Sequence, residues 1–229
     1  MCSHEQRRFP ECEFPPGVAA RSAQGAPVRD AEVRYRGEPL PVGSKGRLSS
    51  GWWGMITVIA TETALFAYLL FSYFYIASQN GGAWPPGGPP SLALAVPGTV
   101  VLMLGSVTMW WGEKGIRAGR QMQLLQGLGA SVLLGLAFIA LEGIEWSKKG
   151  FTPRTNAYGS LYFTVTGFHL THVIVGVLML LMLFVWTLLG YFGVRRHSTV
   201  SIAVLYWHFV TAIWVAVFLT IYVSPYLAR

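Results

Sequence analysis

Residues Gly159 to Gly190 read GSLYFTVTGFHLTHVIVGVLMLLMLFVWTLLG and form the longest apolar stretch of the chain. The stretch contains no Asp, Glu, Lys or Arg. About 20 consecutive apolar residues are enough for a helix to cross the hydrocarbon core of a bilayer. The stretch therefore predicts a transmembrane helix, and this helix places His169 and His172 inside the membrane.

The remainder of the chain extends this composition on both sides. Of the 229 residues, 53% are hydrophobic and 12% are charged, and that charged fraction is about half of what soluble domains carry. The apolar runs predict five spans, at 52–77, 92–112, 122–146, 159–190 and 200–223. Residues 1–50 are rich in Pro, Gly, Arg and Glu and lack periodicity, which predicts a flexible polar tail. We expect residues 51–229 to form an all-α domain with five transmembrane helices.

The distribution of basic residues predicts the orientation of these spans. The net charge is +7, and the basic residues cluster beside the spans. This placement is typical of cytoplasmic loops that meet anionic lipid headgroups, and it does not indicate nucleic-acid binding. An inside N-terminus and an outside C-terminus would place nine basic residues inside and four outside, which satisfies the positive-inside rule. The inside set is Arg34, Arg36, Lys45, Arg47, Lys114, Arg117, Arg120, Arg195 and Arg196, and the outside set is Lys148, Lys149, Arg154 and Arg229.

Several ionisable residues fall within the predicted spans. Counting about 1.5 Å of helical rise per residue places four of them in one layer near the midplane, namely Glu62, His169, His172 and His208. Glu142 and Glu145 fall near the outer surface. An ionisable side chain at the bilayer centre costs roughly 2.5–3.5 kcal/mol on insertion scales, so we expect these groups to face a neighbouring helix or water.

Three kinds of site compete for these residues. An HxxH pair and an ExxE pair suggest a metal centre in a helix bundle, but the two pairs lie at different depths, and a site of Glu62 with three His is the remaining metal alternative. A proton relay or an independent transporter is a second possibility. The third, which we favour, is that Glu142, Glu145, His169 and His172 hydrogen-bond and pack helices. We expect no catalytic residue and no bound metal, and Cys2 and Cys12 in the tail form no recognisable site.

Small and aromatic residues carry structural signals. Glycines on the third and fourth spans allow close helix approach, at Gly127, Gly129, Gly135, Gly167 and Gly176. We expect most tryptophans to lie near span ends, where aromatic belts form, at Trp52, Trp53, Trp110, Trp111, Trp146 and Trp207.

Three segments together resemble one family. WWGMITVIATETALFAYLLFSYFYI (52–76) is similar to the helix of cytochrome c oxidase subunit III that carries a buried glutamate. FIALEGIEWSKKGFTPRTNAYGSLYFTVTGFHLTHVIVG (138–176) resembles its Glu-aromatic motif, outer loop, YGS turn and GFHxxHV helix. YWHFVTAIWVAVFLTIYV (206–223) resembles its closing helix. The three segments occur in the family's order and spacing.

The resemblance implies a non-catalytic subunit of a haem-copper terminal oxidase, a complex that reduces dioxygen and pumps protons. Such a subunit lies in a bacterial plasma membrane or the mitochondrial inner membrane. It packs against catalytic subunit I, beside subunit II and further subunits, and stabilises catalysis and proton uptake. It binds phospholipid, while haem and copper belong to partner subunits. We expect the lipid-binding or helix-contact residues to be Trp52, Trp53, Glu62 and His208.

The chain also departs from the longer family members. Those members have seven helices, whereas five-helix forms occur among quinol oxidases and other bacterial oxidases. Thr211 stands where the closing motif would have Asp, and an acidic residue at Glu142 is similar to the quinol-oxidising branch. The alternatives are an accessory subunit of a nitric oxide reductase, or a free-standing membrane metal enzyme or transporter.

Overall fold

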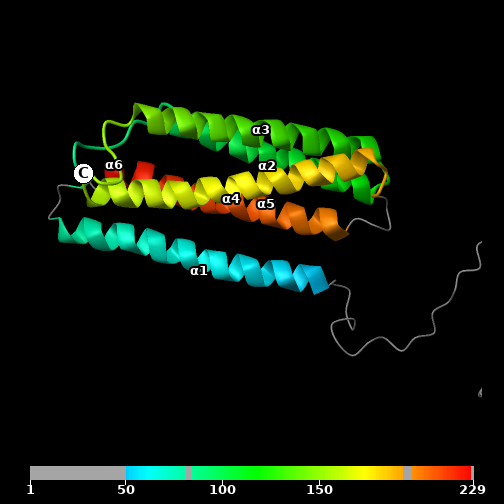
Figure 1. Cartoon of the computed structure of the whole chain (residues 1–229), viewed down its shortest axis with the longest axis horizontal. Coiled ribbons are helices and arrows are strands. Elements are labelled where there is room, and N and C mark those ends of the chain that lie inside the picture. The colour runs from blue at the N-terminus through cyan, green and yellow to red at the C-terminus, as the bar shows by residue number, and fades with distance from the viewer. Residues whose placement is uncertain (1–49, 81–83, 193–197, 228–229) are drawn as a thin grey trace, which may run out of the picture. The chain divides into compact units, whose positions relative to one another are not determined.

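The computed structural model describes residues 50–80, 84–192 and 198–227. The tail predicted for 1–50 lies outside these residues, except for Ser50. The long elements are all α-helices (Figure 1). They are α1 (Ser50–Gln79), α2 (Ala95–Arg117), α3 (Gln121–Lys148), α4 (Ala157–Leu188) and α5 (Ser198–Phe218). The chain continues from α5 through a π-helical turn, η1 (Leu219–Val223), into the short α6 (Ser224–Leu227). The described residues thus contain five helical stretches long and apolar enough to cross a membrane and no strand, which confirms the predicted fold class.

Local signals explain where the helices begin and end. The side chain of Asn156 caps α4 by accepting a hydrogen bond from the backbone N–H of Gly159 at 2.7 Å, which satisfies one of the free donors of the first turn. The turn between α2 and α3 uses Gly119 at a φ of +76°, a conformation that glycine adopts without steric penalty. α2 extends past its predicted end at 112 to Arg117, and Glu113 and Arg117 form an ion pair of 2.7 Å along this extension, of the kind that stabilises helices slightly.

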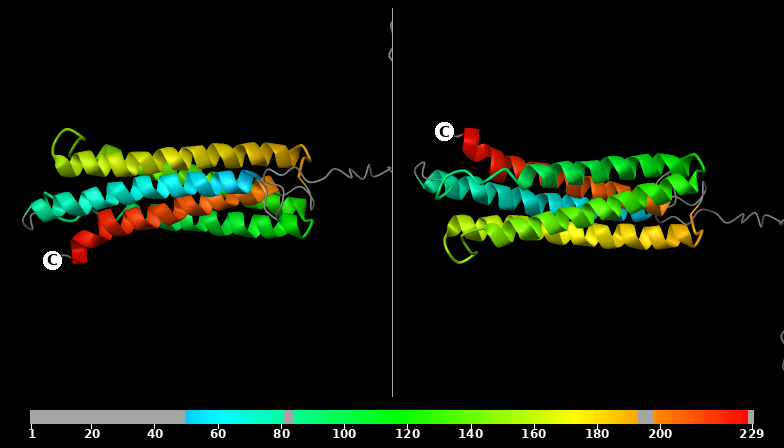
Figure 2. Two further views of the ribbon diagram at one scale, coloured as in Figure 1. Left: turned by 90° about the horizontal axis from the view of Figure 1, so that it is seen from below. Right: turned by 90° about the horizontal axis from the view of Figure 1, so that it is seen from above.

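Successive helices run in opposite directions (Figures 1 and 2). The starts of α1, α3 and α5 therefore meet the ends of α2 and α4 at one end of the bundle, which we call the Ser50 end. The other end, where α1 and η1 finish, is called the Gln79 end. Figure 1 shows α4 and α5 between α1 on one side and the α2–α3 pair on the other, and α1 contacts both α4 and α5.

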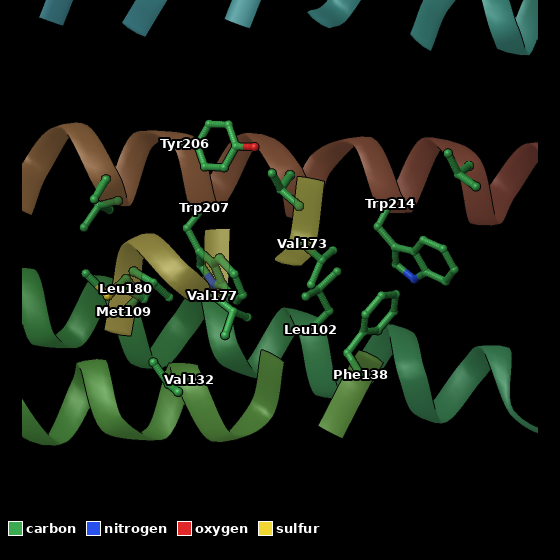
Figure 3. Close-up of a cluster of buried hydrophobic side chains, with 14 of the residues drawn as sticks. Leu102, Met109, Val132, Phe138, Val173, Val177, Leu180, Tyr206, Trp207 and Trp214 are labelled. Atoms are coloured by element: carbon green, nitrogen blue, oxygen red, sulfur yellow. The ribbon is translucent and has the colours of Figure 1, made fainter. Parts of the chain in front are cut away.

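The interior of the bundle is built around Trp207, near the middle of α5. Its side chain is fully buried and points from α5 toward α2 and α3 (Figure 3). Three glycines from three helices form the slot that holds the indole. A Cβ atom at Gly135 of α3 or Gly176 of α4 would lie 2.9 Å from the indole ring, and one at Gly105 of α2 would lie 3.6 Å from it. The expectation that Trp207 belongs to an aromatic belt is wrong, because these glycines leave room for the indole in the core.

The first helix packs much less tightly than the others. Phe66 and Tyr73 are the buried residues of α1, although the helix spans Ser50–Gln79. Large side chains along its outer faces are exposed, such as Tyr68 at 71% and Phe71 at 65%. Lipid or another protein must cover most of α1, since apolar side chains at this level lie in the membrane.

Candidate functional site

A side-chain pair links α1 to the rest of the bundle at mid-membrane depth. Glu62 of α1 places Oε2 3.0 Å from Nε2 of His172 on α4. The Phe66 ring, one turn further along α1, packs edge-on against the same imidazole with ring centroids 5.2 Å apart. The two polar side chains are partly exposed, Glu62 at 31% and His172 at 16%. The pair therefore lies at the edge of the bundle, within reach of lipid or a partner.

The other ring nitrogen of His172, Nδ1, also has a hydrogen-bond partner. Nδ1 lies 2.7 Å from the backbone carbonyl oxygen of Phe168. A carbonyl oxygen only accepts, so Nδ1 carries a hydrogen and donates it. Nε2 and the Glu62 carboxylate then require one further proton between them, on either atom, to form a hydrogen bond. A pair that holds this one proton is electrically neutral on either atom, which suits a membrane interior.

His169, three residues earlier on α4, makes a different contact. Its Nε2 lies 3.1 Å from the backbone carbonyl oxygen of Val210 on α5. The imidazole is buried and packs against Trp214, with ring centroids 4.8 Å apart, and edge-on against Phe138 at 5.8 Å. His169 and His172 thus point to different neighbours, and each joins α4 to another helix.

His208 of α5 hydrogen-bonds Ser106 of α2 through Nδ1. The four polar residues assigned to one layer are therefore divided: the structure joins Glu62 to His172, His169 to the α5 backbone, and His208 to α2. Across residues 50–80, 84–192 and 198–227, no three His, Cys, Asp or Glu side chains gather in a group that could hold a metal ion.

A second polar cluster closes the Gln79 end of the bundle around Glu145 of α3. Oε1 of Glu145 accepts hydrogen bonds from Tyr222 Oη at 2.7 Å and Tyr162 Oη at 3.2 Å. Lys149 Nζ lies 2.9 Å from the same oxygen, and both side chains of this ion pair are largely buried. The two tyrosine hydroxyls are 2.9 Å apart. Glu145 thus connects α3 to α4 and to η1, whose π-helical turn carries Tyr222.

The other predicted site residues make local contacts. Glu142 is buried and accepts a hydrogen bond from Trp146 Nε1 at 3.0 Å, one turn along the same helix. Trp52 and Trp53 pack edge to face with ring centroids 5.2 Å apart at the start of α1. By helical rise they lie about 15 Å along α1 from Glu62, so the tryptophans and the carboxylate occupy different depths.

Comparison with known proteins identifies the family. The matching family model is described as cytochrome c oxidase subunit III, and it covers residues 32–226 of this chain. The chain belongs to the cytochrome c oxidase subunit III family. Human cytochrome c oxidase subunit 3 is 34% identical over 198 residues, which are 83% of this chain and 74% of the relative. The subunit of Artemia franciscana is 36% identical over 174 residues, 74% of this chain and 67% of the relative, and that of Danio rerio is 33% identical over 198 residues, 83% and 74%.

Membership confirms the resemblance drawn from the three sequence segments. As a subunit III, the chain is a non-catalytic component of a haem-copper oxidase and has other subunits of that complex as partners. It is an integral protein of the inner membrane and takes part in respiratory electron transport. The family's subunits carry no catalytic metal site of their own.

Sequence reasoning missed four contact residues of this subunit III: Ser106, Lys149, Tyr162 and Tyr222. A signal existed for Lys149, since it follows Glu145 by four residues, the spacing of a helical ion pair. Tyr162 and Tyr222 are separated from Glu145 by many residues, and η1 rotates Tyr222 relative to a regular helix. No pattern in the sequence connects them to the carboxylate.

Proposed function

We propose that this chain supports the oxidase without redox chemistry of its own, by stabilising catalytic subunit I, sheltering its proton entrance and binding phospholipid along α1. One observation carries the proposal: α1 is largely exposed yet is held to the bundle at mid-membrane by the Glu62–His172 pair. A helix held in this way presents a long apolar face at a defined distance from α4 and α5.

Phospholipid suits this face at two levels. The exposed aromatic and aliphatic side chains of α1 match acyl chains, which need no hydrogen bonds. Trp52 and Trp53 at the Ser50 end supply indole N–H groups at interfacial depth, where tryptophan commonly meets headgroups. Trp53 is 59% exposed, so its ring is accessible to a headgroup. Deeper in the membrane than these tryptophans, the Glu62–His172 pair holds α1 against α4.

The substitution Glu62→Gln tests the role of this pair. We expect the purified complex to keep its haem spectrum but to lose bound phospholipid or to inactivate sooner during turnover, because the proton-sharing carboxyl is gone. Thr63→Val is the matched control, since Thr63 is exposed and its hydroxyl bonds only within α1, to the Ile59 carbonyl at 2.6 Å. Loss of the haem signal, or Glu62→Gln behaving as Thr63→Val does, would contradict the proposal.

Assembly itself is tested by purifying the complex in mild detergent through a tag on this chain. A haem spectrum together with a large multi-span partner is the expected result. A colourless chain, purified alone under conditions that keep membrane complexes intact, would refute the function proposed here.

We also propose that the Ser50 end faces the cytoplasm or its mitochondrial equivalent. The positive-inside rule supports this orientation, because Lys114, Arg117 and Arg120 lie beside the membrane at the Ser50 end. The sequence before α1 and between α4 and α5 contains further basic residues. Single cysteines at Ala118 and at Gly150, in a chain with Cys2 and Cys12 replaced by Ser, would report the orientation through an impermeant thiol reagent. Labelling of intact cells at position 118 but not at 150 would contradict it.

A further inference from the structure

A hollow lies between α2 and α5, and no residue of α1 lines it. Its volume is about 320 Å³, and its walls are largely apolar. The lining residues are Met103, Ser106, Val107 and Trp110 of α2 with His208 and Thr211 of α5. Three of the α2 side chains are about half exposed, at 50% for Met103, 58% for Val107 and 49% for Trp110. The hollow therefore opens outward from the bundle.

The polar part of this hollow lies at the middle of the membrane. Ser106 is the central residue of α2 (Ala95–Arg117), so it lies about 16 Å from either end of that helix. His208 contacts Ser106 across the helix boundary. The hydrocarbon core of a bilayer is about 30 Å thick, which places this pair about 15 Å from the headgroups on both sides.

The hydrogen bond to Ser106 determines what His208 offers to the hollow. Ser106 Oγ and Nδ1 of His208 form one hydrogen bond, and its direction depends on the tautomer of the imidazole. The tautomer in which the hydroxyl donates to Nδ1 is the one that our inference assigns. A neutral imidazole that accepts at Nδ1 carries its hydrogen on Nε2. Nε2 has no acceptor within residues 50–80, 84–192 and 198–227. The Thr211 hydroxyl instead donates within α5, to the Trp207 carbonyl at 3.0 Å.

An N–H group in hydrocarbon needs an acceptor, and acyl chains have none. The phosphate and ester oxygens of a phospholipid lie about 15 Å away at the membrane surface. A transmembrane helix of another protein can bring a hydroxyl, amide or carbonyl oxygen to this depth, and polar side chains of this kind commonly join helices in membranes. We propose that the hollow between α2 and α5 docks a transmembrane helix of a partner subunit that presents a hydrogen-bond acceptor to His208 at mid-membrane.

This inference rests on the proposed function, because it names the face through which the chain joins its complex. The apolar walls fit such a helix. Met103 is unbranched and adapts to an irregular neighbour, and Trp110 provides a large rigid surface of the kind that dominates interfaces. Figure 1 shows α1 and α2 on opposite sides of α4 and α5, and no residue of α1 lines the hollow.

A tryptophan placed in the hollow tests the inference. Val107→Trp fills the space from an exposed position, and Leu133→Trp is the matched control, since Leu133 is 69% exposed on α3. When the complex is purified through its catalytic subunit, we expect Val107→Trp to lower the amount of this chain retained by roughly three- to tenfold, with Leu133→Trp unchanged. The double substitution Ser106→Ala with His208→Phe removes the imidazole N–H and leaves an aromatic ring of similar shape. It should also lower the amount of this chain retained.

The outcomes separate this inference from the proposed function. If the unaltered chain brings down no haem-containing partner, the proposed function fails. If the unaltered chain assembles and Val107→Trp assembles equally well, the docking site alone is wrong. A photoreactive residue at position 107 should cross-link to a partner polypeptide. Cross-links to phospholipid alone would show a lipid site and overturn the inference.

Discussion

Substitution of Gly135 by Ala tests the slot that holds Trp207. The added methyl carbon would lie 2.6 Å from Cγ2 of Val177 and 2.9 Å from the Trp207 ring, whereas carbon atoms pack at about 3.5–4.0 Å. Each neighbour would have to move by about 1 Å. Trp207 cannot withdraw easily, because Gly176 of α4 also lies against the ring, at a projected Cβ distance of 2.9 Å from Cε3. Overpacking of this kind typically costs about 1–3 kcal/mol.

The matched control is Gly143→Ala on the same helix, where an added Cβ meets nothing within 4 Å. Both substitutions gain the same helix propensity, about 1 kcal/mol, so that contribution cancels in the comparison. We expect the free energy of unfolding of Gly135→Ala to lie about 1–3 kcal/mol below that of Gly143→Ala. Titration of the detergent-solubilised chain with SDS, followed by tryptophan fluorescence, measures the difference. Equal stability of the two variants would refute the packing of Trp207 described here.

Three further perturbations follow from the contacts. Lys149→Met removes the cation of a buried ion pair and should lower the unfolding free energy by about 3–5 kcal/mol, whereas Lys148→Met, at the exposed neighbouring residue, should change it little; equal losses would contradict the pairing. A double-mutant cycle of Glu62→Leu with His172→Phe should give a coupling energy of roughly 0.6–2 kcal/mol, and additive effects would show that the two side chains do not interact. Gly127→Ala on α3 places a methyl carbon 2.7 Å from the Cα atom of Gly112, where α2 and α3 cross. The purified complex should therefore melt at a lower temperature, and an unchanged melting temperature would argue against the close approach of α2 and α3.

Much of the fold was predictable because membrane spans follow from local composition. A run such as 159–190 must be helical in a bilayer, since its backbone groups find partners only within the segment. The predicted spans agree with α1 to α5 to within about five residues, and the largest differences are at the end of α2, which continues to Arg117, and at the end of α5, where the π-helical turn η1 begins. The family resemblance was also available, because its motifs are short and lie in the correct order.

The contacts of the polar residues were less predictable. Helical rise correctly suggests that Glu62 and His172 can meet, because depth depends on residue count alone. It does not give the rotation of each helix about its axis, and that rotation decides that His169 faces α5 and His208 faces α2. The assignment of Trp207 to an aromatic belt failed for a similar reason, since the glycines that accommodate it come from three other helices.

The sequence by itself determined that this chain is a five-span helical membrane protein of the subunit III family, because hydrophobic length and motif order are properties of consecutive residues. Only the tertiary structure decided which polar groups contact one another, which one is left facing the hollow between α2 and α5, and how Lys149, Tyr162 and Tyr222 surround Glu145. The physical reason is that hydrogen bonds between helices depend on how the helices are rotated and how closely they approach. Those quantities are set by packing between segments that lie far apart in the chain.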